Sequence, residues 1–327
     1  MTNPTANEVH LDVPLTNVSV AFMQSQEGFV ANQAFPIVPV MKQSDRYYVY
    51  DRADWNRNEM KKRAPGTESA GSGYRLSDDA YLCDVHALHR DIDNQTAANA
   101  DEQFSLQSEA AEFLGLKSLI NREVAFQRTY FKKGVWASNV DVQTSAAFNS
   151  PALGENGYTP IAGIRAERRL QQLRTGIKPN GLIIAAQTWD KLMDNEDFLS
   201  RIIRGASTDR PAAVTRSLLA QMLEIDNIMV ADGLVNNAPE TADGAEDNAF
   251  IMNEGMLLFY RPARASMRTP SAGYPFAWRG LTGQNVEGSA ISRFDMKHLK
   301  SERVEIEDSF AHKVVSAEMG TFIHNTL

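Results

Sequence analysis

The sequence predicts an α+β fold with more than one domain, and three observations carry this prediction. Two strand-like runs, residues 46–51 and 80–89, flank a long charged segment. A helical pattern runs from about residue 105 to residue 133. After residue 159, short helical patterns alternate with short apolar strands. The chain therefore combines long extended segments, one long helix and a smaller unit of alternating helices and strands, which is typical of an α+β fold.

The composition is that of a globular protein. The 327 residues are 43% hydrophobic and 23% charged, which is enough for two or three domains with a substantial core. The net charge of −8 argues against a dedicated nucleic-acid binder, whose affinity comes from Lys and Arg. No run reaches the roughly 18 apolar residues of a membrane span, and the first residues lack a secretory pattern. We expect a soluble chain made in the cytoplasm.

Residues 11–40 are expected to form an extended arm. From Leu11 to Val40 the chain is mixed in character, with three prolines at positions 14, 36 and 39. Its apolar runs are short, at residues 18–22 and 35–40.

Residues 46–89 predict a long hairpin with an unstructured tip. The two strand-like runs alternate with period two, as half-buried strands do. Residues 52–79 between them hold six basic and five acidic side chains and the glycine-rich centre APGTESAGSGY, residues 64–74. This segment has too little apolar surface for a core. A loop of this length is either disordered or laid across another molecule.

The strongest helical pattern covers about residues 105–133. Ser105 is a suitable N-cap, and Lys132, Lys133 and Gly134 form a suitable stop. Apolar residues at spacings of three, four and seven form one expected stripe: Leu106, Ala110, Phe113, Leu116, Ile120, Val124 and Phe131. Such a helix would be about 42 Å long and would exceed a small core.

A second unit begins after a polar connection. Pro160 opens a helix that ends at Gly176, with Ala166, Leu170 and Leu173 on its expected apolar side. Further elements are expected as strands at residues 181–186, 227–231 and 249–260, and as helices at residues 187–203 and 214–224. Residues 261–283 are expected to form a loop, and residues 286–322 have the pattern of strands.

The search for catalytic, cofactor-binding or metal-ligating residues yields none. Cys83, Asp84, His86 and His89 come closest to a metal cluster, but in a strand Cys83 and His89 face one side and the other two the opposite side. The HExxH, CxxC, GxSxG and phosphate-loop motifs are absent from the sequence. Cys83, the single cysteine, is expected to be a packed thiol within a strand.

Several long phrases carry a resemblance to a known family. They are APGTESAGSGY (64–74), NREVAFQRTYF (121–131), TPSAGYPFAW (269–278), HLKSERVEIEDSFAHKVVSAEMGTFI (298–323) and the opening NVSVAFMQSQEGFVANQAFPIVPV (17–40). Taken in their order along the chain, they resemble the major capsid proteins of tailed bacteriophages, over nearly the whole chain. The resemblance implies the Hong Kong 97-type capsid fold. Its parts would be an N-terminal arm (1–44), an E-loop hairpin (45–92), a peripheral domain (93–159) with the spine helix, an axial domain (160–283) and a C-terminal return to the peripheral domain (284–327).

The family implies a structural function without catalysis or cofactors. Copies of the chain would self-assemble as pentamers and hexamers into the icosahedral shell of a virion that encloses the DNA genome. A portal protein, scaffold and decoration proteins, and packaged DNA without specific binding would be its further partners. The charged hairpin tip predicts contacts between subunits, with complementary pairing, through Arg52, Trp55, Arg57, Arg63, Glu68 and Arg75.

Two alternatives from other classes remain. The shell protein of a bacterial nanocompartment shares the fold, but generally has a shorter E-loop and encloses enzymes. A soluble hydrolase could use Asp194, Glu196 and Asp197, although such carboxylates beside a helix more often serve as solvated caps. A sizing column separates these alternatives, because only a shell protein forms megadalton particles.

Overall fold

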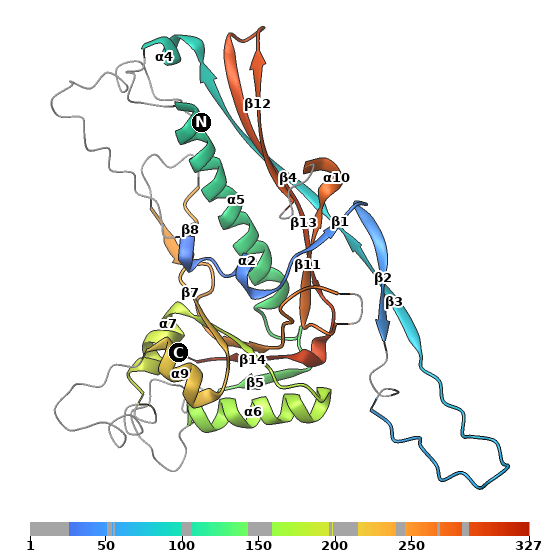
Figure 1. Cartoon of the computed structure of the whole chain (residues 1–327). Coiled ribbons are helices and arrows are strands. Elements are labelled where there is room, and N and C mark those ends of the chain that lie inside the picture. Colours follow the sequence, from blue (N-terminus) through green and yellow to red (C-terminus); the bar gives the residue numbers. More distant parts are fainter. Residues whose placement is uncertain are drawn as a thin grey trace.

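Two five-stranded sheets, one near each end of an elongated molecule, organise the fold (Figure 1). The computed structural model describes residues 26–50, 54, 56–99, 106–142, 159–195, 198, 215–239, 246–266, 269–282 and 288–326. Helices cover the sheets, and a separate two-stranded hairpin projects from the body (Figure 1). The α+β class predicted from the sequence is confirmed.

The upper sheet is built around one long strand. Strand β13 (Ser301–Val314) pairs antiparallel with β12 (Ser289–Met296) and β11 (Gly273–Trp278), and with β4 (Asp84–Asp93) at its other edge. Strand β1 (Val38–Val40) joins β11 in parallel. The long helix α5 (Leu106–Tyr130) packs against β13 and β4, where Ala110 and Leu114 meet Ile92, Val304 and Ile306. The short helix α4 (Asn94–Asn99) follows β4.

The central strands of the lower sheet are buried on both faces. Its order is β5 (Ser138–Asp141), β14 (Gly320–His324), β10 (Met256–Phe259), β6 (Gly181–Ala185) and β7 (Asn227–Ala231). Alternate residues supply two cores: Ile183 and Leu257 join the cluster that includes Phe126 and Tyr130 of α5, whereas Leu182 and Leu258 join the opposite one. Helices line that opposite core: α6 (Pro160–Thr175), α7 (Ala186–Met193) and α9 (Arg216–Leu223).

Short elements complete the described chain. Strands β8 (Leu234–Asn236) and β9 (Asn248–Phe250) form a small antiparallel sheet. Helix α10 (Arg279–Thr282) follows β11, and a 3-10 turn, η3 (Ala317–Met319), precedes β14. The expected strand at 249–260 is thus wrong as one element, because it divides into β9 and β10. The expected loop at 261–283 is also wrong, because it contains β11 and α10.

The expected apolar stripe of α5 is partly wrong. The fully buried side chains recur every four residues as Ala110, Leu114, Phe126 and Tyr130, and the series passes through Arg122. Phe113 is 44% exposed, and Leu116, Ile120 and Val124 are only half-buried. A search for apolar patterns assumes that charged residues are exposed. It therefore misses this face of α5, because Arg122 is buried against Asp308 of β13.

Two truncations separate the real core face from the expected one. Leu114→Ala should lower the free energy of unfolding by about 2–5 kcal/mol, because it opens a cavity beneath a fully buried side chain. Val124→Ala, the control on the half-buried part of the expected stripe, should cost less than half as much. Chemical denaturation of both variants measures the difference. Equal losses would place Val124 in the core and contradict the packing described here.

Helix α6 shows the same kind of correction. It begins at Pro160 and ends before Gly176, whose φ of 76° is left-handed, as the sequence predicts. Its expected apolar side is wrong, because Leu170 is 48% and Leu173 81% exposed. The buried side instead includes Gln171, whose Nε2 donates to the Met319 carbonyl oxygen at 2.7 Å. A satisfied hydrogen bond lets this amide occupy a core position.

A short helix fastens the N-terminal part of the described chain to α5. The segment contains a 3-10 turn, η1 (Gln26–Gly28), and helix α2 (Ala31–Ala34), so residues 26–35 are not simply extended. The backbone N–H groups of Val30 and Ala31 donate to the two carboxylate oxygens of Glu123 at 3.1 and 2.8 Å. The ring of Phe35 then enters the core between α5 and the lower sheet. Residues 1–25 of the expected arm lie outside the described residues.

Glu123 should make stability depend on pH. Burial raises its pKa from 4.5 to about 7, against the smaller effect of the two N–H donors. The folded state therefore holds this proton more tightly than the unfolded state, so the contribution is most favourable below pH 4.5 and is lost as pH rises to about 7. The loss amounts to about 3 kcal/mol at 1.36 kcal/mol per pKa unit.

The measurement is the difference in unfolding free energy between the wild-type protein and Glu123→Gln, followed from about pH 4 to pH 8. Buried His312, whose pKa is lowered to about 4 by burial, has the opposite pH dependence in both proteins. The difference in unfolding free energy between the two proteins therefore contains only the contribution of Glu123. We expect the wild-type protein to lose stability relative to the variant as pH rises, and a flat difference would contradict the pKa assignment.

Candidate functional site: the projecting hairpin

The base of the projecting hairpin is locked to the upper sheet. Strands β2 (Ser44–Tyr50) and β3 (Leu76–Leu82) pair antiparallel, and Tyr81 stacks on Phe276 of β11 with ring centroids 4.5 Å apart. Tyr47 lies against the same ring at 5.4 Å. Two hydrogen bonds join Gln43 to Cys83 at the base of the hairpin. The Gln43 carbonyl accepts from the N–H of Cys83, and the Gln43 Nε2 donates to the Cys83 carbonyl.

Cys83 divides the expected second leg in two. The run at residues 80–89 was expected to be one strand, but β3 ends at Leu82 and β4 begins at Asp84. Strand β3 belongs to the hairpin, and β4 belongs to the upper sheet. Cys83 itself is buried, and burial raises the pKa of its thiol to about 11, so it is an unreactive packing residue.

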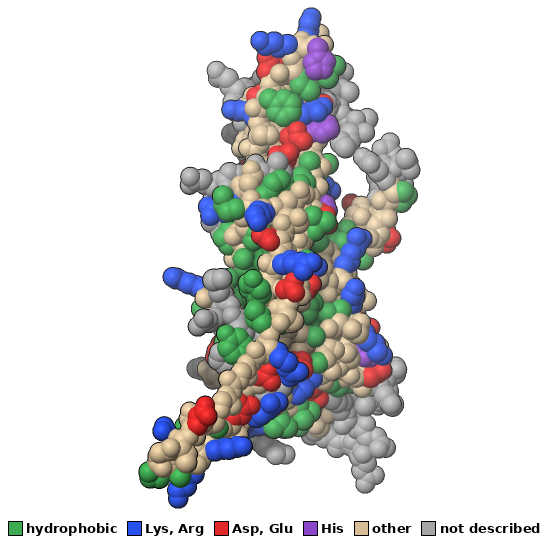
Figure 2. Space-filling view, turned by 90° about the vertical axis from the view of Figure 1, so that its right-hand side faces the viewer, with side chains coloured by type: hydrophobic (Ala, Val, Ile, Leu, Met, Phe, Trp, Pro, Cys, Tyr) green, Lys and Arg blue, Asp and Glu red, His purple; other side chains and the backbone are tan. Residues whose placement is uncertain are grey.

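Exposed aromatic and charged side chains run along the two strands. Tyr48 is 66% exposed, and Arg46 pairs with Asp78 at 2.7 Å. The hydroxyl of Tyr47 donates to Asp79 at 2.8 Å, and this hydrogen bond lowers the pKa of that carboxyl group. Figure 2 shows the hairpin extending away from the body, with basic and acidic side chains mixed along it.

The two sides of the loop beyond the strands are joined by one carboxylate. Asp54 accepts from the backbone N–H of Arg75 at 2.9 Å and from its guanidinium at 3.1 and 3.3 Å. These hydrogen bonds lower the pKa of Asp54. Only 7% of the Asp54 side chain is exposed, whereas its cationic partner is 71% exposed. The loop therefore has internal organisation that its glycine-rich sequence does not predict.

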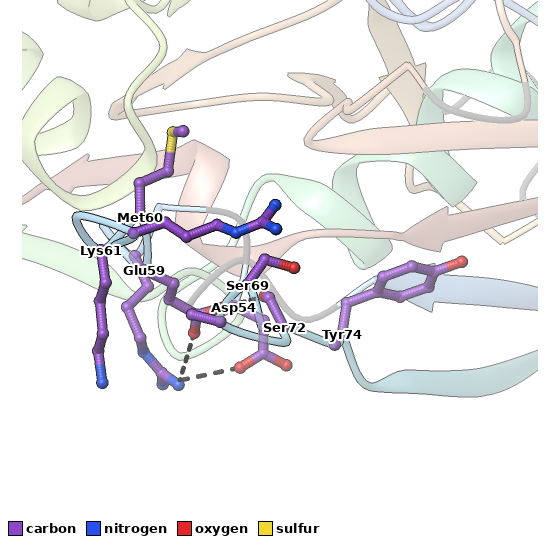
Figure 3. Close-up of a pocket in the computed structure, with 11 residues that line it drawn as sticks. Asp54, Glu59, Met60, Lys61, Ser69, Ser72 and Tyr74 are labelled. Atoms are coloured by element: carbon purple, nitrogen blue, oxygen red, sulfur yellow. Dashed lines mark hydrogen bonds and ion pairs between the residues drawn. The ribbon is translucent and has the colours of Figure 1, made fainter. Parts of the chain in front are cut away.

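The tip surrounds an open hollow of about 470 Å³. Arg57 reaches both Asp54, at 3.7 Å, and Glu59, at 3.4 Å, and the Ser72 hydroxyl donates to Glu59. Figure 3 shows these acidic groups gathered on one side, whereas Lys61 points away from them. Met60 is 94% exposed. The tip presents a partly ordered mixture of charge and apolar surface.

The structure brings together three of the six residues predicted for subunit contacts. Arg57, Arg63 and Arg75 lie in the organised loop, where the Nε of Arg63 donates to the Thr67 carbonyl at 2.5 Å. Glu68 is exposed, and Arg52 and Trp55 lie outside the described residues. The sequence analysis missed Asp54 as the organising residue, and it missed the exposed Tyr48, Met60 and Tyr74. Aromatic residues in a charged loop were the available signal.

The described part of the chain gives little support for a metal site, a hydrolase site or a membrane span. No group of three His, Cys, Asp or Glu residues there is arranged to hold a metal ion. Asp194 is the C-terminal cap of α7, while Glu196 and Asp197 lie outside the described residues. No helix among the described residues is long and apolar enough to cross a membrane.

Comparisons with known proteins identify the fold. No protein-family model matches the sequence. The chain is 22% identical over 321 residues to the major capsid protein of Pseudomonas phage JBD67, covering 97% of both chains. A phage-related protein from Bordetella bronchiseptica matches with a TM-score of 0.69 at 15% identity, covering 93% of this chain and 94% of that one. The capsid of cyanophage P-SCSP1u matches with a TM-score of 0.62 at 9% identity, covering 99% of this chain and 95% of that one. This chain has the phage capsid fold.

The resemblance found in the sequence is therefore confirmed, and it points to a structural protein rather than an enzyme. The nanocompartment alternative shares the fold: the SrpI encapsulin from Synechococcus elongatus matches with a TM-score of 0.56 at 10% identity, covering 95% and 93%. The curated relative, which is matched over 97% of its length, is a phage capsid protein. This relative favours the capsid over the nanocompartment.

Proposed function

We propose that this chain is the major capsid protein of a tailed phage, and that copies of it form the pentamers and hexamers of a closed shell around the DNA genome. The full-length match to a phage major capsid protein carries this proposal. The protein is made in the cytoplasm of the bacterial host and becomes part of the virion. Portal, scaffold and decoration proteins are its proposed further partners.

The family's domains are assigned by the order of the elements. Residues 1–44 form the N-terminal arm and residues 45–92 the E-loop. Residues 93–159, with α5 as the spine helix, and residues 284–327 form the peripheral domain. Residues 160–283 form the axial domain. Strand β11 qualifies this division, because it lies within 160–283 and yet pairs with β13 of the upper sheet.

The projecting hairpin is the proposed clasp between neighbouring subunits. Its base is fixed by Tyr81 and Tyr47 on Phe276, so the loop leaves the body in a defined direction. Internal pairing of Asp54 with Arg75 reduces the entropy lost when the tip docks. The exposed Met60 and Tyr74 supply apolar contact area. Each contact is modest, but repetition around a closed shell makes the assembly strong.

Packaged DNA is expected to lie against this protein without being gripped. The chain has 41 acidic and 33 basic residues, so counterion release contributes little to DNA affinity.

Size and content of the purified particles test the proposal. We expect megadalton shells in negative-stain electron microscopy after expression of the full chain, with the scaffold protein added if phage assembly requires it. Particles from infected cells should contain DNA. Enzyme cargo in place of DNA would support the nanocompartment alternative. A monomer or dimer under all of these conditions would overturn the assignment.

A further inference from the structure

One face of α5 carries apolar side chains that do not belong to any core cluster of the described residues. Phe113, Leu116 and Ile120 lie at spacings of three and four, so they share one side of the helix. Phe113 is 44% exposed, and the other two are half-buried. Among the described residues, the four buried clusters and the side chains packed against them include none of these three. We call Phe113, Leu116 and Ile120 the α5 stripe.

The α5 stripe leads directly to the anchor of the N-terminal segment. Glu123 follows Ile120 by three residues and therefore lies on the same side of the helix. Its carboxylate is the group that holds the N–H groups of Val30 and Ala31. Helix α2 accordingly lies beside the lower half of α5 (Figure 1). Val30 and Ala31, four and five residues after the first described residue, thus lie at the end of the stripe.

The segment before Gln26 matches the stripe in length and pattern. Two runs alternate apolar and other residues with period two: Leu11, Val13 and Leu15, and then Val18, Val20 and Phe22. Extended chain covers about 3.3 Å per residue, so fifteen residues reach about 50 Å. The stripe is only about 10 Å long at 1.5 Å per helical residue. One of these runs is therefore long enough to cover it.

We propose that residues 11–23 of the same chain lie along the α5 stripe, with alternate side chains against Phe113, Leu116 and Ile120. The attachment at Glu123 makes this docking intramolecular, so a small apolar contact suffices to hold it. The N-terminal arm then acts as a cover for the spine helix of its own subunit. This inference stands on the α5 face and the anchor, independently of the shell function.

Thiol labelling tests the cover. Ile120→Cys is introduced with Cys83→Ala, and labelling by a small maleimide is timed in the full chain and in a chain lacking residues 2–23. We expect labelling of the full chain to be about tenfold slower, because the thiol reacts only when the cover opens. Arg128→Cys, an exposed position on α5 outside the stripe, is the matched control and should react equally in both chains. Equal rates at position 120, whether fast or slow, would overturn the proposal.

A cross-link identifies which copy supplies the cover. Val20→Cys combined with Ile120→Cys is oxidised mildly in the Cys83→Ala background and run on a non-reducing gel. An internal disulfide, seen as a monomer band with altered mobility, supports the proposal. A dimer band would place the arm of a neighbouring copy on the stripe and overturn it, as would the absence of a cross-link. Particle formation by the uncross-linked variants is recorded separately, so failure of the cover and failure of the shell function are distinguished.

Discussion

Replacing residues 51–75 with an Asp-Gly turn should leave the subunit folded and abolish shell formation. Tyr50 lies directly opposite Leu76 in the hairpin, so a two-residue turn can close the strands without changing their register. The loop contributes no residue to the described core clusters, and the ion pairs of its described residues are internal to it. The deletion removes from the subunit only the surface that we propose contacts the neighbouring subunit.

Three measurements decide the result. Circular dichroism and thermal melting should match those of the parent chain, while sizing and negative-stain microscopy should show small species in place of shells. A chain in which residues 56–74 become a Gly/Ser linker of equal length is the matched control, and it should also fail to assemble if the tip contacts matter. Normal shells from the Asp-Gly variant would contradict the clasp. Loss of folding would instead make the loop part of the subunit core.

Arg122→Ala should destabilise the subunit by about 3–5 kcal/mol, because it leaves a buried carboxylate without its partner. The guanidinium of Arg122 donates to Asp308 at 2.8 Å, and their side chains are only 6% and 3% exposed. The same guanidinium lies over the ring of Phe310, with 5.1 Å to the centroid. The loss would approach the total stability of a typical domain, about 5–15 kcal/mol. Denaturant unfolding measures it.

A double replacement separates the charge from the shape. Arg122→Met with Asp308→Leu removes both charges and keeps apolar volume at the junction of α5 and β13, so we expect most of the lost stability to return. Stability as low as in Arg122→Ala would show that the packing of Arg122 on Phe310, or the Ser118 hydroxyl that donates to Asp308, matters more than the ion pair.

Local signals in the sequence were sufficient for many elements. Pro160 and Gly176 bound α6, since a proline fits the first helical position and a glycine the left-handed end. Strands β6 and β7 lie at the predicted runs, and both ends of α5 lie within three residues of the expected ends. These signals depend on neighbouring residues alone. The hairpin with a projecting tip was also predictable, because a charged, glycine-rich segment cannot form a core of its own.

Features that depend on distant residues required the tertiary structure. The sequence does not reveal that Asp308 lies opposite Arg122, and this pairing decides which face of α5 is buried. It does not reveal that the strand pairing changes at Cys83, because β4 finds its partner in β13, more than two hundred residues away. Nor does it reveal that Asp54 joins Arg75 across the loop. In each case the deciding partner lies beyond the reach of local sequence patterns. Local patterns determine where helices and strands form, whereas long-range satisfaction of buried polar groups decides how they face one another.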